Sequence, residues 1–194
     1  MIKVERTDAP EWLLENWEQW GKDYEESEKF EWRFGPKKKR ELTDLLKKMT
    51  AHHCSYCDSF PLGKRQIKDT IDHFRPKETF KLWAYLWGNL FIACHYCQER
   101  GSRFDERLLK PDEENYGFDE YFMFDFTTFK IVPNPLKSKE NQERAQITID
   151  LFRLNGQPED AGTTEDCMIE RERIYEKYKN DPDIDCLPYR FMFR

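Results

Sequence analysis

The sequence contains no long hydrophobic run. The longest stretch without a charged residue covers positions 82–98, and Trp, Tyr, Gly, Asn, His, Gln and two Cys residues interrupt it. Such a stretch is unsuited to crossing a bilayer. The first residues, MIKVERTDAPEW, are charged and lack the apolar core of a signal peptide. Internal repeats and low-complexity segments are also absent. These absences predict a soluble, cytoplasmic protein without membrane association.

Aromatic residues, in contrast, are abundant. The 194 residues include 6 Trp, 9 Tyr and 15 Phe, or 15% of the chain. This supply of apolar area argues against intrinsic disorder. The length is that of one domain, or of a small domain with helical extensions.

The net charge of −6 hides a segregation along the chain. Residues 1–30 carry 4 basic against 9 acidic side chains, residues 31–110 carry 17 against 10, and residues 111–194 carry 11 against 19. An acidic chain with a pI near 5.4 counts at first against a nucleic-acid partner. A single charge run is usually a solvated surface. The basic middle segment is more informative, because it contains every motif described below. We expect the acidic flanks to limit unselective binding of nucleic acid.

Four of the six cysteines form two Cys-x-x-Cys pairs, Cys54 with Cys57 and Cys94 with Cys97. Each pair can offer two thiolates to one tetrahedral Zn²⁺. In a cytoplasmic chain that needs no disulfide scaffold, paired motifs of this kind favour metal binding. Two unrelated redox or core pairs are the alternative. The other two cysteines are expected to be ordinary buried thiols: Cys167 and Cys186.

Hydrophobic spacing predicts helices on both sides of the cysteine pairs, over residues 10–29, 41–49 and 141–154, and from 163 onward. A strand is expected over residues 66–74, and a hairpin or strand pair over 121–133. The apolar stretch 82–94 is expected to be buried packing, and a short basic helical turn follows the second cysteine pair. The aromatic tail after residue 186 is expected to pack on the body or to dock a partner.

Between the cysteine pairs stands Asp72-His73, and Asn89 lies shortly before Cys94. Hydrolysis of a phosphodiester needs a base, and neutral His serves as one near pH 7. It also needs a hard cation that stabilises charge on the phosphate and the leaving oxygen. Mg²⁺ accepts carboxylate and amide oxygens as ligands. Neighbouring side chains on a strand point to opposite faces, so Asp72 and His73 need local distortion or different reaches to serve one site.

The order of these motifs resembles that of the HNH endonuclease family: CSYC, DHFRP, NLFIAC and CHYC. The resemblance implies a ββα-metal core flanked by zinc knuckles. Carried over position by position, it makes His73 the general base and Asp72 a ligand of a catalytic Mg²⁺ or Mn²⁺. Asn89 becomes the middle residue of the motif, which holds the loop and His73 in place. The four paired cysteines become ligands of a structural Zn²⁺.

One position departs from the family pattern. The residue after the second Cys-x-x-Cys is usually Asn or His, and here it is Gln98. Gln98 offers the same amide oxygen on a longer side chain, and we assign it as a further catalytic residue and ligand of the Mg²⁺, directly or through water. The departure equally fits weakened or altered activity.

Longer stretches resemble one branch of this family, the PtuB-like subunits of Septu anti-phage systems and their retron-linked relatives. They include ELTDLLKKMTAHHCSYC, DHFRPK, YCQERGSRF and FDEYFMFDFTTFKIVP, so the resemblance covers most of the chain. It implies a defence nuclease that cleaves DNA beside a PtuA-type ATPase partner, with its activity controlled by that partner or by infection. Two alternatives stay open: an RNA-cleaving nuclease of a retron-type system, and a zinc-stabilised module that binds nucleic acid or a partner and has lost catalysis.

The predicted fold is therefore α+β. A small ββα-metal (HNH) core over residues 51–110, with two zinc knuckles, is wrapped by an N-terminal helical segment, 1–50, and by a C-terminal hairpin and helical extension, 111–194. Four basic residues of the core are the candidates for phosphate contact: Arg75, Lys77, Arg100 and Arg103.

Overall fold

The computed structural model describes residues 1–63, 67–156, 161–180 and 183–193. The chain has a mixed α+β fold, as the sequence predicts. Its helices are α1 (Glu11–Leu14), α2 (Trp17–Ser27), α3 (Pro36–Met49), α4 (His95–Gln98), α5 (Phe118–Tyr121), α6 (Lys139–Leu151) and α7 (Ala161–Tyr178), with 3₁₀ turns η1 (Lys81–Trp83), η2 (Trp87–Asn89) and η3 (Arg190–Met192). Its strands are β1 (Asp69–His73), β2 (Leu90–Cys94), β3 (Phe122–Asp125) and β4 (Lys130–Pro133).

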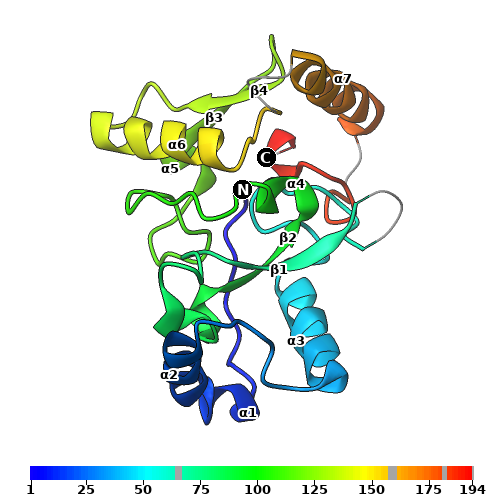
Figure 1. The fold of residues 1–194 in the computed structure, drawn as a ribbon. Helices are drawn as coiled ribbons and strands as arrows, with labels where there is room; N and C mark the ends of the chain where they lie inside the picture. Colours follow the sequence, from blue (N-terminus) through cyan, green and yellow to red (C-terminus); the bar gives the residue numbers. More distant parts are fainter. Residues whose placement is uncertain (64–66, 157–160, 181–182, 194) are drawn as a thin grey trace.

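Two antiparallel ribbons, β1–β2 and β3–β4, organise these elements. Figure 1 shows β1–β2 in the middle of the molecule, with α1, α2 and α3 at one end and β3–β4, α6 and α7 at the other. None of the helices in the described ranges combines the length and apolarity that a membrane crossing requires.

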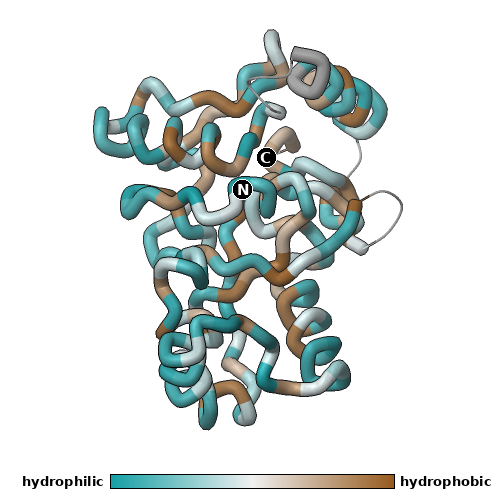
Figure 2. Tube along the Cα trace, viewed as in Figure 1, coloured by the Kyte–Doolittle hydropathy of each residue, from teal (hydrophilic) through white to brown (hydrophobic). Residues whose placement is uncertain are grey.

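The β1–β2 ribbon carries the motif residues at its two ends. Asp69 pairs with Cys94 and His73 pairs with Leu90. All five residues of β2 are buried, and Figure 2 shows hydrophobic positions in this central region. The strand predicted over 66–74 is thus shorter, and residue 66 lies outside the described residues. The apolar stretch 82–94, expected only to be buried packing, ends in a strand over its last five residues. A continuous apolar run lacks the alternation that marks a half-buried strand.

The helix predicted over residues 10–29 is divided into α1 and α2. In α2, Gly21 lies against the η1 turn: a Cβ at this position would come within 2.4 Å of the carbonyl oxygen of Leu82. Glycine therefore permits the close approach of α2 to η1. The helix predicted over residues 41–49 is α3, which begins earlier, with Pro36 at its first turn, and buries Leu42 and Leu46.

The residues before α1 contact the start of β2 and the segment after residue 110. The Arg6 guanidinium donates to the carbonyl oxygens of Trp87, at 2.8 Å, and Leu90, at 3.2 Å. It also forms an ion pair with Asp112. The backbone N–H of Val4 donates to the carbonyl of Pro111 at 2.9 Å. The first residues of the chain thus fasten the start of β2 to the segment that follows residue 110.

The segments after residue 110 pack against the loop of the first cysteine pair. The predicted hairpin is the β3–β4 ribbon. The Phe152 ring, which follows α6, stacks on Tyr56 between the first two cysteines, with 3.8 Å between ring centroids. The aromatic tail packs on the body, because Arg190 forms a buried ion pair with Asp58 at 2.6 Å. The last described residues therefore support the loop that carries the first cysteine pair.

Candidate metal centre and active site

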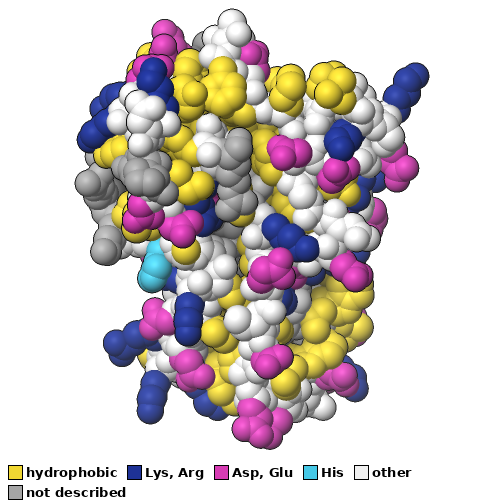
Figure 3. All heavy atoms as spheres, turned by 180° about the vertical axis from the view of Figure 1, so that it is seen from behind, with side chains coloured by type: hydrophobic (Ala, Val, Ile, Leu, Met, Phe, Trp, Pro, Cys, Tyr) yellow, Lys and Arg dark blue, Asp and Glu magenta, His cyan; other side chains and the backbone are white. Residues whose placement is uncertain are grey.

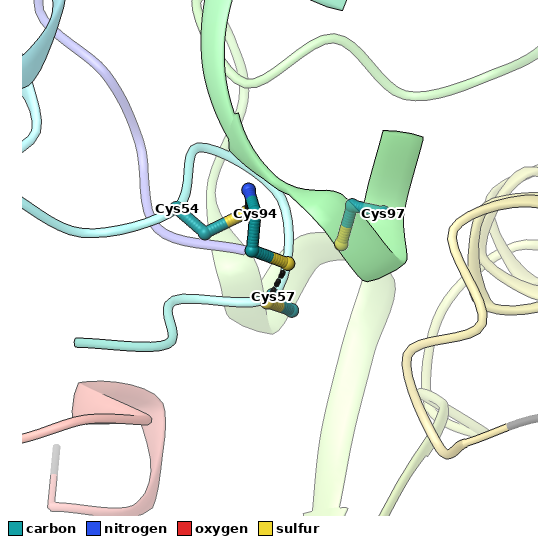
Figure 4. A group of neighbouring side chains, drawn as sticks. All are labelled: Cys54, Cys57, Cys94 and Cys97. Atoms are coloured by element: carbon teal, nitrogen blue, oxygen red, sulfur yellow. Dashed lines mark hydrogen bonds between the residues drawn. The ribbon is translucent and has the colours of Figure 1, made fainter. Parts of the chain in front are cut away.

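The four paired cysteines meet at the Cys94 end of the β1–β2 ribbon, as the sequence predicts. Their sulfur atoms all lie within 4.8 Å of one another, and the Sγ atoms of Cys57 and Cys94 are 3.6 Å apart. Figure 4 shows one pair on the loop before β1 and the other at the end of β2 and on α4. Sulfur atoms around one tetrahedral Zn²⁺ lie about 3.8 Å apart, given Zn–S bonds of about 2.3 Å. The cluster therefore fits a structural metal such as zinc.

Burial and mutual hydrogen bonds shift the pKa values of the clustered thiols in opposite directions. Hydrogen bonds from Cys54, Cys94 and Cys97 hold the pKa of the Cys57 thiol well below its usual range, whereas burial raises the pKa of Cys54 and hydrogen bonds from the other three cysteines raise that of Cys97. The backbone N–H of Cys94 points at the Sγ of Cys54, at 3.3 Å. Such N–H···S contacts stabilise thiolates that ligate a metal.

The remaining two cysteines lie outside the cluster. Cys167 is half-buried, and burial raises the pKa of its thiol. Cys186 is exposed, so the prediction of a buried thiol is wrong there. The chain turns inward only after it, at Leu187, which is 7% exposed.

Asp72 and His73 stand at the opposite end of the ribbon and face different neighbours. The Asp72 carboxylate accepts hydrogen bonds from the Tyr56 hydroxyl, at 2.7 Å, and from the Arg100 guanidinium, at 3.0 Å. The His73 ring lies parallel to Trp32, with 5.7 Å between centroids. This division is the one expected for consecutive residues of a strand. The two side chains therefore have separate sets of neighbours.

His73 is enclosed by aromatic rings. It is 8% exposed, and Phe30 meets its ring edge-on at 5.3 Å. Burial lowers the pKa of His73 to about 4, although the charge of Asp72 opposes the shift. The imidazole is therefore neutral at pH 7. Its Nε2 atom is buried and has no hydrogen-bond partner in the described part of the chain. The Tyr85 hydroxyl donates to the carbonyl of Glu31, which fixes the segment that covers the ring.

Asn89 fastens the loop that follows His73. Its side-chain oxygen accepts from the backbone N–H of Arg75 at 2.7 Å, and its side-chain nitrogen donates to the carbonyls of Arg75 and Trp83. Its own carbonyl accepts from the N–H of Phe74 at 2.9 Å. Asn89 is 3% exposed, so these bonds are sheltered from water. The end of β1 is thereby tied to the turn before β2.

The residues expected to hold a catalytic Mg²⁺ do not fit such an ion as they are arranged. Gln98 is exposed at the end of α4, and the charge of Asp72 is already balanced by Arg100. Among the described residues, only the cysteine cluster brings three or more His, Cys, Asp or Glu ligands together. The structure thus places a buried imidazole and a four-cysteine cluster that could hold a metal at separate ends of the ribbon.

Three of the four basic candidates are at least partly exposed. Arg75 pairs with Glu106 at 2.7 Å and lies 4.9 Å above the Trp83 ring. Lys77 pairs with the neighbouring Glu78. Figure 3 shows basic and acidic side chains interspersed on the face opposite to Figure 1. The third, Arg103, is exposed, and its Nε donates to the backbone carbonyl of residue 100.

The prediction that Arg100 contacts phosphate is wrong for this conformation. Its side chain is 0% exposed, because the guanidinium enters the core and pairs with Asp72. A buried carboxylate requires a counter-charge, and Arg100 supplies it.

Three residues of this site carry no sequence signal that marks them as part of it: Tyr56, Phe30 and Trp32. Tyr56 lies 16 positions from Asp72, and Trp32 precedes β1 by a whole helix. No local pattern connects such distant partners. Comparison with protein-family models and with curated proteins finds no match for the chain.

Proposed function

We propose that this chain is a zinc-stabilised endonuclease of the HNH type that hydrolyses phosphodiester bonds in DNA. The observation that carries the proposal is His73: a neutral imidazole at the end of β1, next to Asp72 and followed by a loop that Asn89 holds. The four-cysteine cluster supports it, since a bound metal would fix both β2 and α4 relative to β1. A defence role beside a PtuA-type ATPase is part of the proposal and is supported by the sequence resemblance alone.

His73 would act as the general base. Its unpartnered Nε2 is the atom that can accept a proton from the attacking water. Burial is the largest cause of its low pKa, so displacement of the covering rings would return the pKa toward the ordinary 6.5. A base with a pKa near the working pH is the more effective one. Catalysis would therefore require movement of the segment that carries Phe30 and Trp32.

A divalent cation such as Mg²⁺ or Mn²⁺ would supply charge stabilisation on the phosphate and the leaving oxygen. Asp72 and Gln98 would be its ligands only in a conformation that differs from this one. The protein itself would hold the end of β1 through Asn89. Its basic side chains near His73 would attract the phosphates.

Arg75, Lys77 and Arg103 are the residues proposed to contact the substrate. Arg75 and Lys77 lie on the loop directly after His73, and each has a carboxylate partner. Ion pairs at the surface contribute little stability, so a phosphate can replace these carboxylates at small cost.

A second candidate function is a zinc-stabilised module that binds nucleic acid or a partner without cleaving it. Three observations favour it: Gln98 is exposed, Asp72 is paired with Arg100, and His73 is covered. A Gln98→Asn variant separates the two functions. Activity that appears only in the variant supports a module that has lost catalysis, whereas a small change in an existing activity supports a working nuclease.

The proposed function is tested by incubating the zinc-loaded protein with DNA and RNA in Mg²⁺, Mn²⁺ or EDTA, with and without the ATPase. We expect metal-dependent cleavage of DNA and a loss of about 10²-fold or more in His73→Ala. The control is His52→Ala, because His52 is exposed and lies outside the site. Cleavage of RNA alone would redirect the proposal to RNA. Absence of cleavage in every condition, or equal cleavage by His73→Ala, would refute the assignment.

A further inference from the structure

We propose that the start of α3 binds the phosphate backbone of DNA and extends the substrate surface beyond the loop that follows His73. Four consecutive cations lie there, and we call them the α3 patch: Lys37, Lys38, Lys39 and Arg40. The inference rests on the proposed function for the choice of DNA as the ligand, and it is tested by binding alone.

The first support is the availability of the α3 patch. All four side chains are exposed, and none has an ion-pair partner among the residues that the structure describes. Farther along the same helix, by contrast, Lys47 pairs with Asp69 at 2.7 Å. The carboxylate of Glu41, which directly follows the patch, accepts a hydrogen bond from the Trp12 indole at 3.0 Å. In Figure 3, Lys and Arg side chains project at the lower left, where α3 lies when the view of Figure 1 is turned. The patch is therefore open to an external anion.

The second support is the position of the patch on its helix. The start of an α-helix carries a partial positive charge, which acidic side chains normally offset. The first turn of α3 contains no acidic residue, and Gly35 provides no side-chain hydrogen bond to the free N–H groups. Four cations at this end repel the helix dipole and one another, so they lower the stability of the helix. A phosphate bound there would relieve this repulsion.

The third support is the distance from the patch to the rings that cover His73. The Nζ atom of Lys39 lies 5.9 Å from the centre of the Trp32 ring, which stacks on His73. The Nζ atom of Lys77, on the loop after β1, lies 5.2 Å from the centre of the Phe30 ring, which meets His73 edge-on. Cations from two separate segments therefore reach the aromatic cover of the proposed base. A nucleic-acid backbone carries a row of phosphates and can engage both segments at once, whereas a single small anion cannot.

The test is the fluorescence anisotropy of a labelled DNA duplex, titrated with zinc-loaded protein at several salt concentrations and without Mg²⁺ or Mn²⁺. The patch variant replaces all four cations by glutamine, which keeps a long side chain and a similar helix propensity. At about 0.1 M salt, we expect its affinity to be about tenfold or more below that of the wild type. The slope of log affinity against log salt concentration should decrease in magnitude by about 2–4, because each lost phosphate contact removes about 0.9.

The matched control removes the same charge at the other end of the molecule, from exposed positions on α6, on α7 or directly after α7. Its substitutions are Lys139→Gln, Arg173→Gln, Lys177→Gln and Lys179→Gln. This control should keep the wild-type salt slope. An equal loss in the control would show that net charge alone governs binding and would overturn the proposal. Wild-type affinity in the patch variant would overturn it as well.

The patch variant should melt at or above the wild-type temperature, because it loses like charges at the positive end of a helix. If it melts lower, the double variant Lys37→Gln/Arg40→Gln takes its place. In the described part of the chain, the cations of the patch that lie over aromatic rings are the other two, Lys38 and Lys39. The double variant should lose about half as much of the salt slope, and an unchanged slope would overturn the proposal.

Competing polyanions identify the ligand. Unlabelled DNA should displace the labelled duplex from the wild type more effectively than polyglutamate of equal charge. Equal displacement would indicate an acidic protein segment and overturn the choice of DNA, as would tighter binding of RNA of the same sequence. A protein that binds DNA through the α3 patch and cleaves nothing would refute the proposed function alone. Cleavage by the wild type, with unchanged DNA binding in the patch variant, would refute this inference alone.

Discussion

Asn89 and Arg75 are joined by two hydrogen bonds, in which one side-chain amide satisfies both backbone groups of the other residue, at 2.7 and 3.0 Å. Asn89→Ala removes these bonds and leaves sheltered backbone groups without partners. We expect the free energy of unfolding to fall by about 2–3 kcal/mol, as measured by urea denaturation. The control is Asn115→Ala, at an exposed position, which should change it by less than about 0.5 kcal/mol. Equal effects of the two variants would show that the two Asn89–Arg75 hydrogen bonds do not stabilise the fold.

The cysteine cluster predicts one zinc ion per chain. Cys54→Ser should lose the metal and much of the fold, because a structural zinc contributes folding free energy directly. Zinc content by mass spectrometry and the melting curve measure both effects. Cys186→Ser is the control, since Cys186 is exposed and outside the cluster. Full zinc occupancy in Cys54→Ser would show that this thiol is not a ligand.

The buried imidazole predicts a dependence of stability on pH. The folded pKa of His73 is about 4, against an ordinary 6.5. Between these values the unfolded chain binds a proton that the folded chain does not, so this contribution is complete above pH 6.5 and is lost as the pH falls toward 4. The loss amounts to about 3 kcal/mol in total. Urea denaturation of the wild type and of His73→Phe at pH 7.5 and 4.5 measures it. The variant should lose less stability over this interval, and identical losses would contradict the burial of a neutral ring.

The ion pair of Arg190 and Asp58 predicts that the C-terminal tail stabilises the first cysteine loop. Asp58 is 1% exposed and Arg190 is 7% exposed. Arg190→Met leaves a buried carboxylate unpaired and should destabilise the fold by about 3–5 kcal/mol. Lys137→Met is the matched control, because its partner Glu120 is exposed and the effect should stay within about 1 kcal/mol. An equal loss of unfolding free energy in both variants would show that the buried Arg190–Asp58 pair stabilises the fold no more than a surface ion pair.

Much of the local structure could be predicted from the sequence. Apolar residues at helical spacing identified α3, and the aromatic stretch over residues 121–133 identified the β3–β4 hairpin. These features depend on neighbours within a few positions. The division of α1 from α2 and the strand β2 were missed. Nothing in the structure explains the first. β2 is buried throughout, so periodicity does not distinguish it from other apolar packing.

In the candidate site, too, some features follow from local sequence and others do not. Two Cys-x-x-Cys motifs predict a four-thiol cluster, because each pair brings its two sulfurs together locally. The pairing of Asp69 with Cys94 in the β1–β2 ribbon, which the spacing does not reveal, brings the two pairs together. The alternation of side chains along a strand likewise predicts that Asp72 and His73 face apart. The sequence therefore determined which four cysteines could hold a metal and that Asp72 and His73 lie on opposite sides of one strand.

Only the tertiary structure decided which side chains cover each face of β1. Asp72 meets a guanidinium 28 positions later in the chain, and His73 lies beneath the ring of Trp32. Whether a carboxylate is available to a metal ion, and whether an imidazole is open to water, depends on burial and counter-charge. Both come from residues far apart in sequence, so no spacing rule could supply them.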